Sequence, residues 1–313
     1  MQRILITGGN SFSARHAVTI LRAQAGVIIG GFGRRGGDVS QVDEWFTGDI
    51  RNRDEIRQAV HQFCPEAVLH LAACSDPFDV GLVVQTNVTG TWNLLAACEE
   101  SARPCSVLLV GSAASFGEMQ PGEHALSGHR VPRPREIYGC SRQWQLELAR
   151  LFAGSEQLRI VQCRTFNLIG PGLPEKYAAA AIAKRILQLP RGSRQQFPMR
   201  DPGVVRDLVD VRDAVRAWLA ILRTGKPDFP YSIGRGIGVT IAQLALEIAD
   251  IHGVELILQE LPALSTGTRS RIVCSVADQT TLTADTGWQP QISVRRSLTD
   301  MVEQLYPCRT GAT

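Results

Sequence analysis

The chain has 313 residues, of which 44% are hydrophobic and 20% are charged, and its formal net charge is +3. This composition is typical of a soluble globular protein with one large or two medium domains. The small charge, without a long basic run, argues against nucleic acid as the main partner. The first apolar run begins at residue 3 and no run reaches the ~18 residues of a membrane span, so we expect neither a signal peptide nor a membrane anchor. The eight cysteines include no CxxC pair, which favours free thiols and a cytoplasmic location.

Short apolar runs alternate with longer amphipathic segments through the first half of the chain. The apolar runs predict strands at 3–7, 26–32, 67–73, 105–114 and 158–166. The amphipathic segments predict helices at 12–24, 53–63, 87–101 and 138–153. Buried strands joined by connections of helix length imply right-handed βαβ units. We therefore expect an α/β fold with a doubly wound parallel (Rossmann) sheet.

The alternation changes after Asn167. Helices are expected at 176–189, 211–223 and 240–253, with a strand at 229–234, whereas 190–203 has an irregular pattern. This change predicts a smaller C-terminal α/β domain interleaved with the last elements of the first. We assign a dinucleotide-binding domain to residues 1–166 with about 205–235, and a substrate domain to 167–204 and 236–313.

A glycine-rich turn lies between the first strand and the first helix, in the sequence ITGGNSFSARH. A dinucleotide pyrophosphate binds at this junction on the free amides of the helix N-terminus. The usual fingerprint has three glycines, and here Gly8, Ser11 and Ala14 fill the three places. Both replacements are small, so we expect a cofactor at this turn. The alternative is a strand-to-helix turn that binds no ligand.

The end of the second strand predicts which dinucleotide is bound. An acidic residue at that position accepts the ribose hydroxyls of NAD, but the sequence GVIIGGFGRR has none and continues into Arg34 and Arg35. Guanidinium groups suit a 2′-phosphate, so NADP(H) is favoured and NAD(H) is possible. The alternative is that both arginines are solvated loop residues.

Seven motifs of the chain occur in the order found in the extended short-chain dehydrogenase/reductases, a family of nucleotide-sugar epimerases, dehydratases and reductases. The motifs are TGGNSF (7–12), HLAA (70–73), TNVTGTWNLL (86–95), VGSAASFG (110–117), YGCSR (138–142), RTFNLIGPG (164–172) and VRDLVDVRDAVRAW (205–218). Residues 280–305, TTLTADTGWQPQISVRRSLTDMVEQL, resemble the C-terminal segment of the same family, so the resemblance covers nearly the whole chain. VGSAASFG, RTFNLIGPG and VRDLVDVRD look most similar to the motifs of GDP-4-keto-6-deoxy-mannose reductases. Dehydratases of the family carry acids after the catalytic serine or threonine, where this chain has Ala113, Ala114 and Ser115, so dehydration is disfavoured.

The resemblance implies three catalytic residues. Tyr138 would donate a proton to a carbonyl oxygen, and Ser112 would hydrogen-bond the same oxygen. Arg142 stands where the family has lysine, one helical turn after Tyr138, where a fixed positive charge would favour the ionised phenol and hold the nicotinamide ribose. The planar guanidinium cannot place its charge as an ammonium does and releases no proton. Activity with altered geometry, weak activity and loss of catalysis therefore stay open.

The resemblance also implies binding residues. The cofactor residues would be Gly8, Asn10, Ser11, Phe12, Arg34, Arg35, Asp49, Ile50, Leu71, Ala72, Ala73, Asn87, Tyr138, Arg142 and Thr165. The substrate residues would be Ser112, Asn167, Arg206 and Arg269. For Asp49 and for Asn87 a helix cap is an equally good account. We interpret His70 as a core histidine and Asp207, Asp210 and Asp213 as a solvated face or caps, and we expect no metal site.

The resemblance thus implies reduction of a nucleotide-linked 4-keto-6-deoxy sugar by NADP(H). A nucleotide-sugar C4 epimerase that keeps its cofactor bound, and a catalytically degenerate nucleotide-sugar binder, are the alternatives. Trp92 and Trp144 lie on the two helices that pair across a four-helix bundle in the family, so a homodimer is expected.

Overall fold

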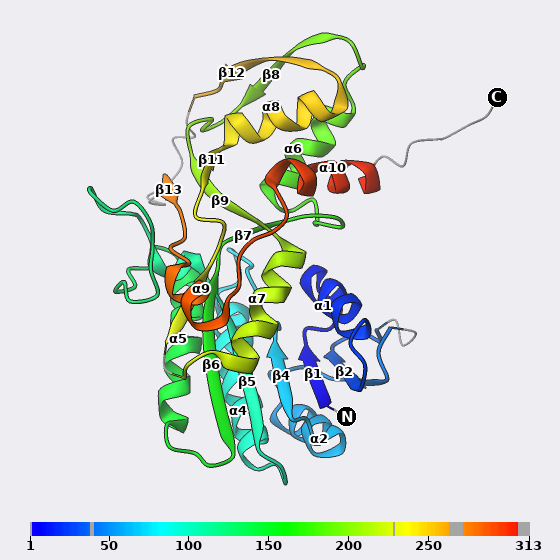
Figure 1. The fold of residues 1–313 in the computed structure, drawn as a ribbon, viewed down its shortest axis with the longest axis vertical. Coiled ribbons are helices and arrows are strands. Elements are labelled where there is room, and N and C mark those ends of the chain that lie inside the picture. Colours follow the sequence, from blue (N-terminus) through cyan, green and yellow to red (C-terminus); the bar gives the residue numbers. More distant parts are fainter. Residues whose placement is uncertain (1, 38–40, 228, 263–271, 306–313) are drawn as a thin grey trace, which may run out of the picture.

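The structure is a computed structural model that describes residues 2–37, 41–227, 229–262 and 272–305. Its main sheet has seven parallel strands in the order β10-β6-β5-β4-β1-β2-β3 (Figure 1). The strands are β1 (Gln2–Thr7), β2 (Val27–Gly33), β3 (Glu44–Thr47), β4 (Ala67–His70), β5 (Cys105–Ser112), β6 (Leu158–Thr165) and β10 (Pro230–Ile233). The strand order reverses at β1, so β1 and β4 flank the point where ligands bind in doubly wound sheets.

Helices cover both faces of this sheet, because alternate strand residues point to opposite faces and both are apolar. Ile4 and Ile6 pack into one core and Leu5 into the other. The first core lies under α1 (Phe12–Arg22), α7 (Val211–Thr224) and α9 (Thr280–Thr286). The second lies under α2 (Arg53–Phe63), α4 (Gly90–Glu99) and α5 (Ile137–Leu148). A continuous helical stretch precedes α4, formed by α3 (Val80–Val84) and a π-helical turn at Gln85–Thr89.

A smaller part of the molecule lies beyond the C-terminal ends of these strands, at the end opposite α2 (Figure 1). It packs α6 (Ala178–Leu187), α8 (Ile241–His252) and α10 (Val294–Leu305) around a third core that includes Ile186, Ile248 and Met301. A parallel strand pair, β8 (Arg194–Met199) and β12 (Glu255–Glu260), covers one side. A second small sheet connects the two parts and consists of β7 (Asn167–Ile169), β9 (Val205–Asp210), β11 (Gly238–Thr240) and β13 (Cys274–Ser275).

The elements expected in the first half are present, and the predicted doubly wound sheet is confirmed. The helix expected at 87–101 belongs to a stretch that begins earlier, at Val80. The irregular pattern predicted for 190–203 is wrong in part, because it contains β8. This strand escaped prediction because its sequence RQQFPM is polar, contains Pro198 and pairs only with β12.

The seven cysteines in the described residues are free thiols, and Cys308 lies outside them. Within the same ranges, every helix is too short or too polar to cross a lipid bilayer.

Candidate active site

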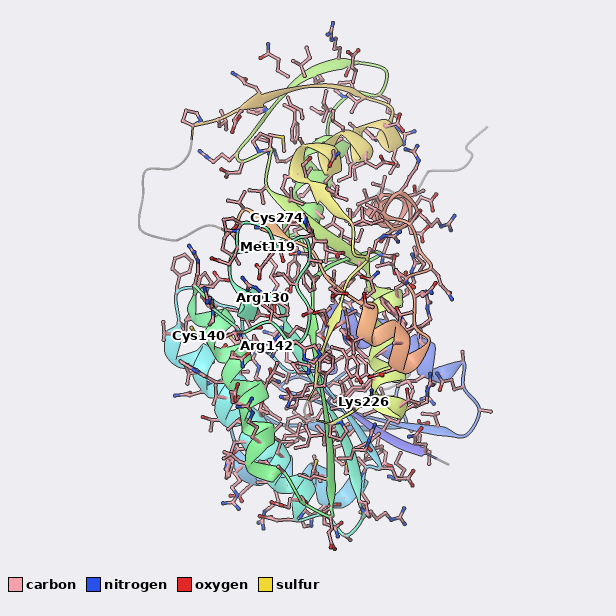
Figure 2. All side chains as sticks on the ribbon, turned by 60° about the vertical axis from the view of Figure 1, so that its left-hand side comes forward. Met119, Arg130, Cys140, Arg142, Lys226 and Cys274 are labelled. Atoms are coloured by element: carbon pink, nitrogen blue, oxygen red, sulfur yellow. The ribbon has the colours of Figure 1, made fainter. Side chains whose placement is uncertain are left out.

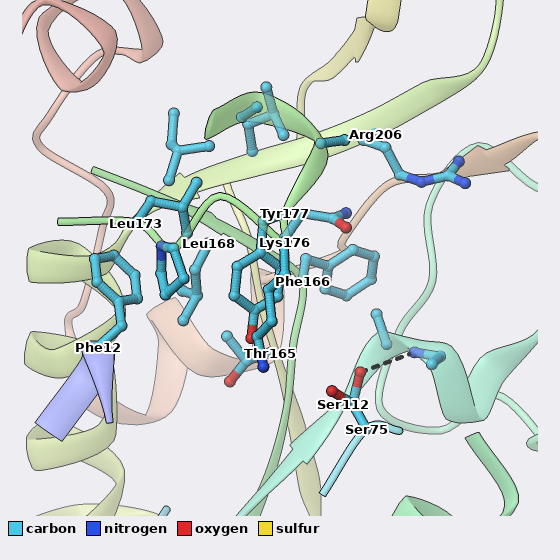
Figure 3. Close-up of a pocket in the computed structure, with 18 of the residues that line it drawn as sticks. Phe12, Ser75, Ser112, Thr165, Phe166, Leu168, Leu173, Lys176, Tyr177 and Arg206 are labelled. Carbon is cyan, nitrogen blue, oxygen red and sulfur yellow. Dashed lines mark hydrogen bonds between the residues drawn. The ribbon is translucent and has the colours of Figure 1, made fainter. Parts of the chain in front are cut away.

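A cavity of about 940 Å³ lies between the C-terminal ends of the sheet strands and the smaller part of the molecule. This is the position that doubly wound folds use for ligands. Figure 3 shows it with Phe12 and Ser112 on opposite sides. The predicted site residues that line it are Asn10, Ser11, Phe12, Leu71, Ala73, Ser112, Tyr138, Arg142, Thr165, Asn167 and Arg206.

Other predicted residues do not line this cavity. They are Gly8, Arg34, Arg35, Asp49, Ile50, Ala72 and Asn87. Gly8 and Ala72 support its floor, Asn87 supports α5, and the others lie around the end of β2 and the start of α2. Arg269 lies outside the described residues.

The turn after β1 brings the first helix close to the end of β4. Gly8 has a φ of 67°, and an added Cβ would lie 2.8 Å from the Ala72 backbone nitrogen, so only glycine fits. Ser11 caps α1: its Oγ accepts the Ala14 N–H at 3.2 Å, and its φ of −71° is unstrained. The serine and alanine that replace two glycines of the fingerprint are therefore compatible with the turn.

Ser112 and Tyr138 reach the cavity from neighbouring elements. Ser112 ends β5, and its Oγ accepts the Ala114 N–H at 3.2 Å, as the dashed line in Figure 3 shows. Tyr138 lies in the first turn of α5 and is half-buried. A hydroxyl and a phenol thus line one cavity at the C-terminal edge of the sheet.

Arg142, which Figure 2 labels, lies on α5 one helical turn after Tyr138. Arg142 is only 3% exposed, and one nitrogen of its guanidinium donates to the Val110 carbonyl. Nε and Nη1 have no hydrogen-bond partner among the described residues. The guanidinium carbon lies 5.9 Å from the centre of the Tyr138 ring. A buried cation with two unused donors therefore lines the cavity beside the phenol.

His70 lies beneath these residues in a chain of buried hydrogen bonds. Its Nδ1 lies 2.7 Å from Thr7 Oγ1, and its Nε2 lies 2.9 Å from Thr91 Oγ1, which donates to the Asn87 carbonyl at 2.7 Å. Because the Thr91 proton is used there, we assign the imidazole proton to Nε2 and the acceptor role to Nδ1. Burial, with the nearby Arg142 charge, lowers the pKa of His70 to about 3. The prediction of a core histidine with satisfied hydrogen bonds is confirmed.

Asn87 connects the hydrogen bonds around His70 to α5. Its side chain accepts from the Cys74 N–H and donates to the Cys74 carbonyl, both at 2.8 Å, and it donates to Ser141 Oγ at 2.9 Å. Ser141 Oγ donates in turn to the Tyr138 carbonyl at 2.8 Å. Asn87 lies in the π-helical turn, so the helix-cap alternative is wrong. Sequence reasoning missed Thr91 and Ser141, since a hydroxyl within a helix carries no signal of its own.

The helix-cap alternative for Asp49, in the segment after β3, is wrong as well. Asn52 caps α2, whereas the Asp49 carboxylate pairs with Arg51, with Nη2 to Oδ2 at 2.6 Å. Hydrogen bonds from Arg51 lower the pKa of Asp49. Ile50 is buried under Gly90 of α4. Across the sheet edge, Arg34 and Arg35 are exposed.

The far end of the cavity is basic. Arg206 is half-buried and donates to the carbonyls of Val205 at 2.9 Å and Ile272 at 2.8 Å, and burial lowers its pKa. The basic lining residues are Arg15, Arg142, Lys176, Arg185, Arg200 and Arg206, against the acidic residues Glu136 and Asp201. Among the described residues that line the whole cavity, six cations against two anions favour a negatively charged ligand. Sequence reasoning missed Lys176, Arg185 and Arg200, which lie just before α6, on α6 and directly after β8.

The three aspartates at 207, 210 and 213 are buried, so the solvated face predicted for them is wrong. Asp207 accepts backbone N–H groups of Arg235, Gly236 and Ala277, and burial raises its pKa. Asp210 caps α7, as the cap alternative predicted, and Asp213 accepts backbone N–H groups from residues 291–292. No cluster of three or more metal-ligating side chains occurs in the described part of the chain.

A doubly wound sheet with a close first βα turn and a cavity at its C-terminal edge is the arrangement of a dinucleotide-binding protein. The chain belongs to the NAD dependent epimerase/dehydratase family, whose model matches residues 4–234. The family predicted from the motifs, and an NAD(P)-dependent enzyme of that family, are thereby confirmed.

Comparison with known proteins finds both reductases and epimerases. The chain is 30% identical to GDP-6-deoxy-D-mannose reductase of Pseudomonas aeruginosa over 239 residues, 75% of this chain and 78% of that protein. The structure of RMD from Pseudomonas aeruginosa complexed with NADPH has a TM-score of 0.82 at 24% identity, covering 97% and 98% of the two chains. UDP-glucose 4-epimerase of Thermus thermophilus, complexed with NAD, has a TM-score of 0.83 at 26% identity, covering 98% and 100%. Bound NADPH and NAD among these neighbours agree with the cofactor prediction.

Proposed function

We propose that the protein is an NADP(H)-dependent reductase of a nucleotide-linked 4-keto-6-deoxy sugar. The observation that carries this proposal is the convergence of Ser112, Tyr138 and buried Arg142 on one cavity whose far end is basic. A basic end suits the diphosphate of a nucleotide sugar, with Arg206 and Asn167 as its proposed ligands. The similarity to a GDP-6-deoxy-D-mannose reductase adds support.

The residues present fit a dinucleotide cofactor. Gly8 carries no side chain at the turn where a pyrophosphate docks, and two Arg142 nitrogens beside the cavity have no partner among the described residues. When bound, the cofactor supplies the hydride that reduces C4. Tyr138 then donates its hydroxyl proton to the carbonyl oxygen, and Ser112 Oγ donates a hydrogen bond to the same oxygen. The Arg142 charge stabilises the phenolate left on Tyr138.

The preference for NADP(H) rests on Arg34 and Arg35, which are exposed directly after β2, where a 2′-phosphate would lie. We assign cofactor binding to residues 1–166 with about 205–235 and substrate binding to 167–204 and 236–313. A cytoplasmic location is proposed in accord with the free thiols.

A C4 epimerase is the second candidate. It is favoured by the pea bifunctional UDP-glucose and UDP-xylose 4-epimerase, which is 24% identical over 96% of this chain. An epimerase returns the hydride to its substrate and keeps NAD bound, whereas a reductase exchanges NADPH. The purified protein is therefore denatured and the released nucleotide measured. Stoichiometric NAD would favour the epimerase over the reductase.

The proton donor is tested with Tyr138→Phe. We expect this variant to lose reduction of 4-keto-6-deoxy sugars while its NADPH dissociation constant stays within about twofold of the parent, because the phenol contributes to chemistry more than to binding. GDP-, UDP-, dTDP- and CDP-linked sugars serve as the substrate panel. Undiminished turnover would eliminate Tyr138 as the donor.

Arg142→Lys separates an adapted arginine from a degenerate one. If the guanidinium is adapted to its bond with the Val110 carbonyl, lysine should lower kcat by about tenfold or more, because it loses the planar donor set. A large gain from a negligible baseline would instead assign the protein to the catalytically degenerate class. Arg150→Lys is the matched control, because Arg150 is an exposed arginine on the turn after α5 that pairs with Glu147.

We also propose a homodimer formed through α4 and α5. Trp92 and Trp144 are 42% and 44% exposed on these helices, and a partner helix pair would cover them.

A further inference from the structure

Trp45 lies in a cradle of glycines at the edge of the main sheet. It is the β3 residue that pairs with Gly31 of β2. A Cβ at Gly31 or Gly37 would overlap the indole ring, and one at Gly9 would come within 2.8 Å of it. A Cβ at Gly33 would lie 3.3 Å away. The half-buried indole therefore contacts the first βα turn, β2 and the loop after β2 together.

The loop that rests on the indole, residues 33–37, carries Arg34 and Arg35. Hydrogen bonds connect it to its surroundings: Asn10 Nδ2 donates to the Arg35 carbonyl at 3.0 Å, and the Gly48 N–H donates to the Gly33 carbonyl at 3.0 Å. Three of its five residues are glycines, which favour many backbone conformations. The ring contacts at Gly33 and Gly37, on either side of the arginines, restrict that freedom.

We propose that Trp45 is a positioning residue that sets the preference for NADP(H), by holding Arg34 and Arg35 where they read the 2′-phosphate. The inference rests on the proposed use of NADP(H). A loop already held in its binding conformation loses less entropy when the phosphate binds, so affinity increases without a contact between indole and cofactor. NAD(H) has no 2′-phosphate and gains nothing from the arginines.

Calorimetry of cofactor binding tests this proposal without knowledge of the substrate. Dissociation constants for NADPH, NADH and 2′,5′-ADP are measured for the parent, Trp45→Ala and Trp45→Phe. In Trp45→Ala we expect about tenfold weaker binding of NADPH and 2′,5′-ADP, as for a lost charge-assisted contact, and less than about twofold change for NADH. Trp45→Phe keeps a ring in the cradle and should keep most of the preference, and it also serves if the alanine variant does not fold.

Phe63→Ala is the matched control. The Phe63 ring is fully buried and packs on Gly30, the neighbour of Gly31, from the opposite face of the same strand, about 2.9 Å from an added Cβ. Phe63 belongs to α2, and its ring is not among the atoms nearest to an added Cβ at Gly33 or Gly37, where the Trp45 indole lies. This variant should lower stability at least as much as Trp45→Ala and leave the ratio of NADPH to NADH affinity unchanged.

Coupling to the arginines is measured in a double-mutant cycle. In an Arg34→Ala/Arg35→Ala background, Trp45→Ala should change NADPH affinity by less than about twofold, because the groups it positions are gone. A parent ratio preserved in Trp45→Ala, or an equal loss of ratio in Phe63→Ala, would overturn the inference while the proposed reductase stands. A parent protein that binds NADH more tightly than NADPH would overturn the proposed cofactor and the inference with it.

Discussion

Acidification should weaken the folded state through His70, whose imidazole is completely buried between Thr7 and Thr91. In the unfolded chain histidine has a pKa of ~6.5, whereas the folded protein lowers the pKa of His70 to about 3. Below about pH 6.5 the imidazole of His70 therefore binds a proton in the unfolded state but not in the folded state. Stability conferred by neutral His70 is present above that pH and is lost progressively down to about pH 3.

The size of the effect follows from the two pKa values. Each pH unit inside this window costs about 1.4 kcal/mol, so a change from about pH 7.5 to about pH 5 should remove about 2 kcal/mol of unfolding free energy through this residue. Urea unfolding followed by circular dichroism at both pH values measures the loss. His70→Gln, which keeps a donor for Thr91, should show a loss smaller by about that amount, whatever its stability at neutral pH.

His61→Gln is the control, because His61 is exposed on α2. Its loss on acidification should match that of the parent within about 0.5 kcal/mol. Equal losses of unfolding free energy in the parent and in His70→Gln would refute the reasoning. His70 would then bind a proton as readily in the folded protein as in the unfolded chain.

Two further predictions concern the first turn and the exposed tryptophans. Gly8→Ala should lose about 1–2 kcal/mol from its positive φ, and more from overlap with the Ala72 backbone, and should weaken NADPH binding. Gly26→Ala is its control, since Gly26 has a φ of 78° but no atom within 4 Å of an added Cβ. Equal melting temperatures for the two variants would contradict the close-approach argument. Trp144→Glu should convert a dimer into a monomer in sedimentation, by placing a charge in an apolar interface, whereas Leu246→Glu, at a residue 43% exposed on α8, should not. An unchanged sedimentation coefficient for Trp144→Glu would exclude α5 from the contact.

The main sheet could be predicted because its strands are continuous apolar runs with helix-length connections, and both their faces are buried. The positions of Gly8, Ser112 and Tyr138 follow from that topology, because the C-terminal ends of parallel strands meet at one edge. Strand β8 could not be predicted, since its pairing with β12 connects segments about 60 residues apart and leaves polar side chains in solvent.

The contacts of the buried residues in the site could not be predicted from the local sequence, for a different reason. The burial of Arg142 depends on the Val110 carbonyl of β5, which accepts a hydrogen bond from the guanidinium. The role of Asn87 depends on a π-helical turn, which the sequence of residues 85–89 does not predict. Trp45 looks like any aromatic strand residue, and its glycine contacts come from two separate stretches of the chain, at Gly9 and at residues 31–37. Side-chain pattern predicts which elements form, but contacts between elements decide what each polar group does.

The buried chain from Thr7 through His70, Thr91, Asn87 and Ser141 to the Tyr138 carbonyl joins elements that are distant in sequence. Its members come from β1, β4, the π-helical turn, α4 and α5. Tyr138, Ser141 and Arg142 all lie on α5, so the backbone carbonyl at which this network ends belongs to the same helix as the phenol and the guanidinium. The first turn of α5 is therefore held by contacts that run through β1, β4, α4 and the π-helical turn, so a substitution at any of these buried positions can disturb the placement of Tyr138.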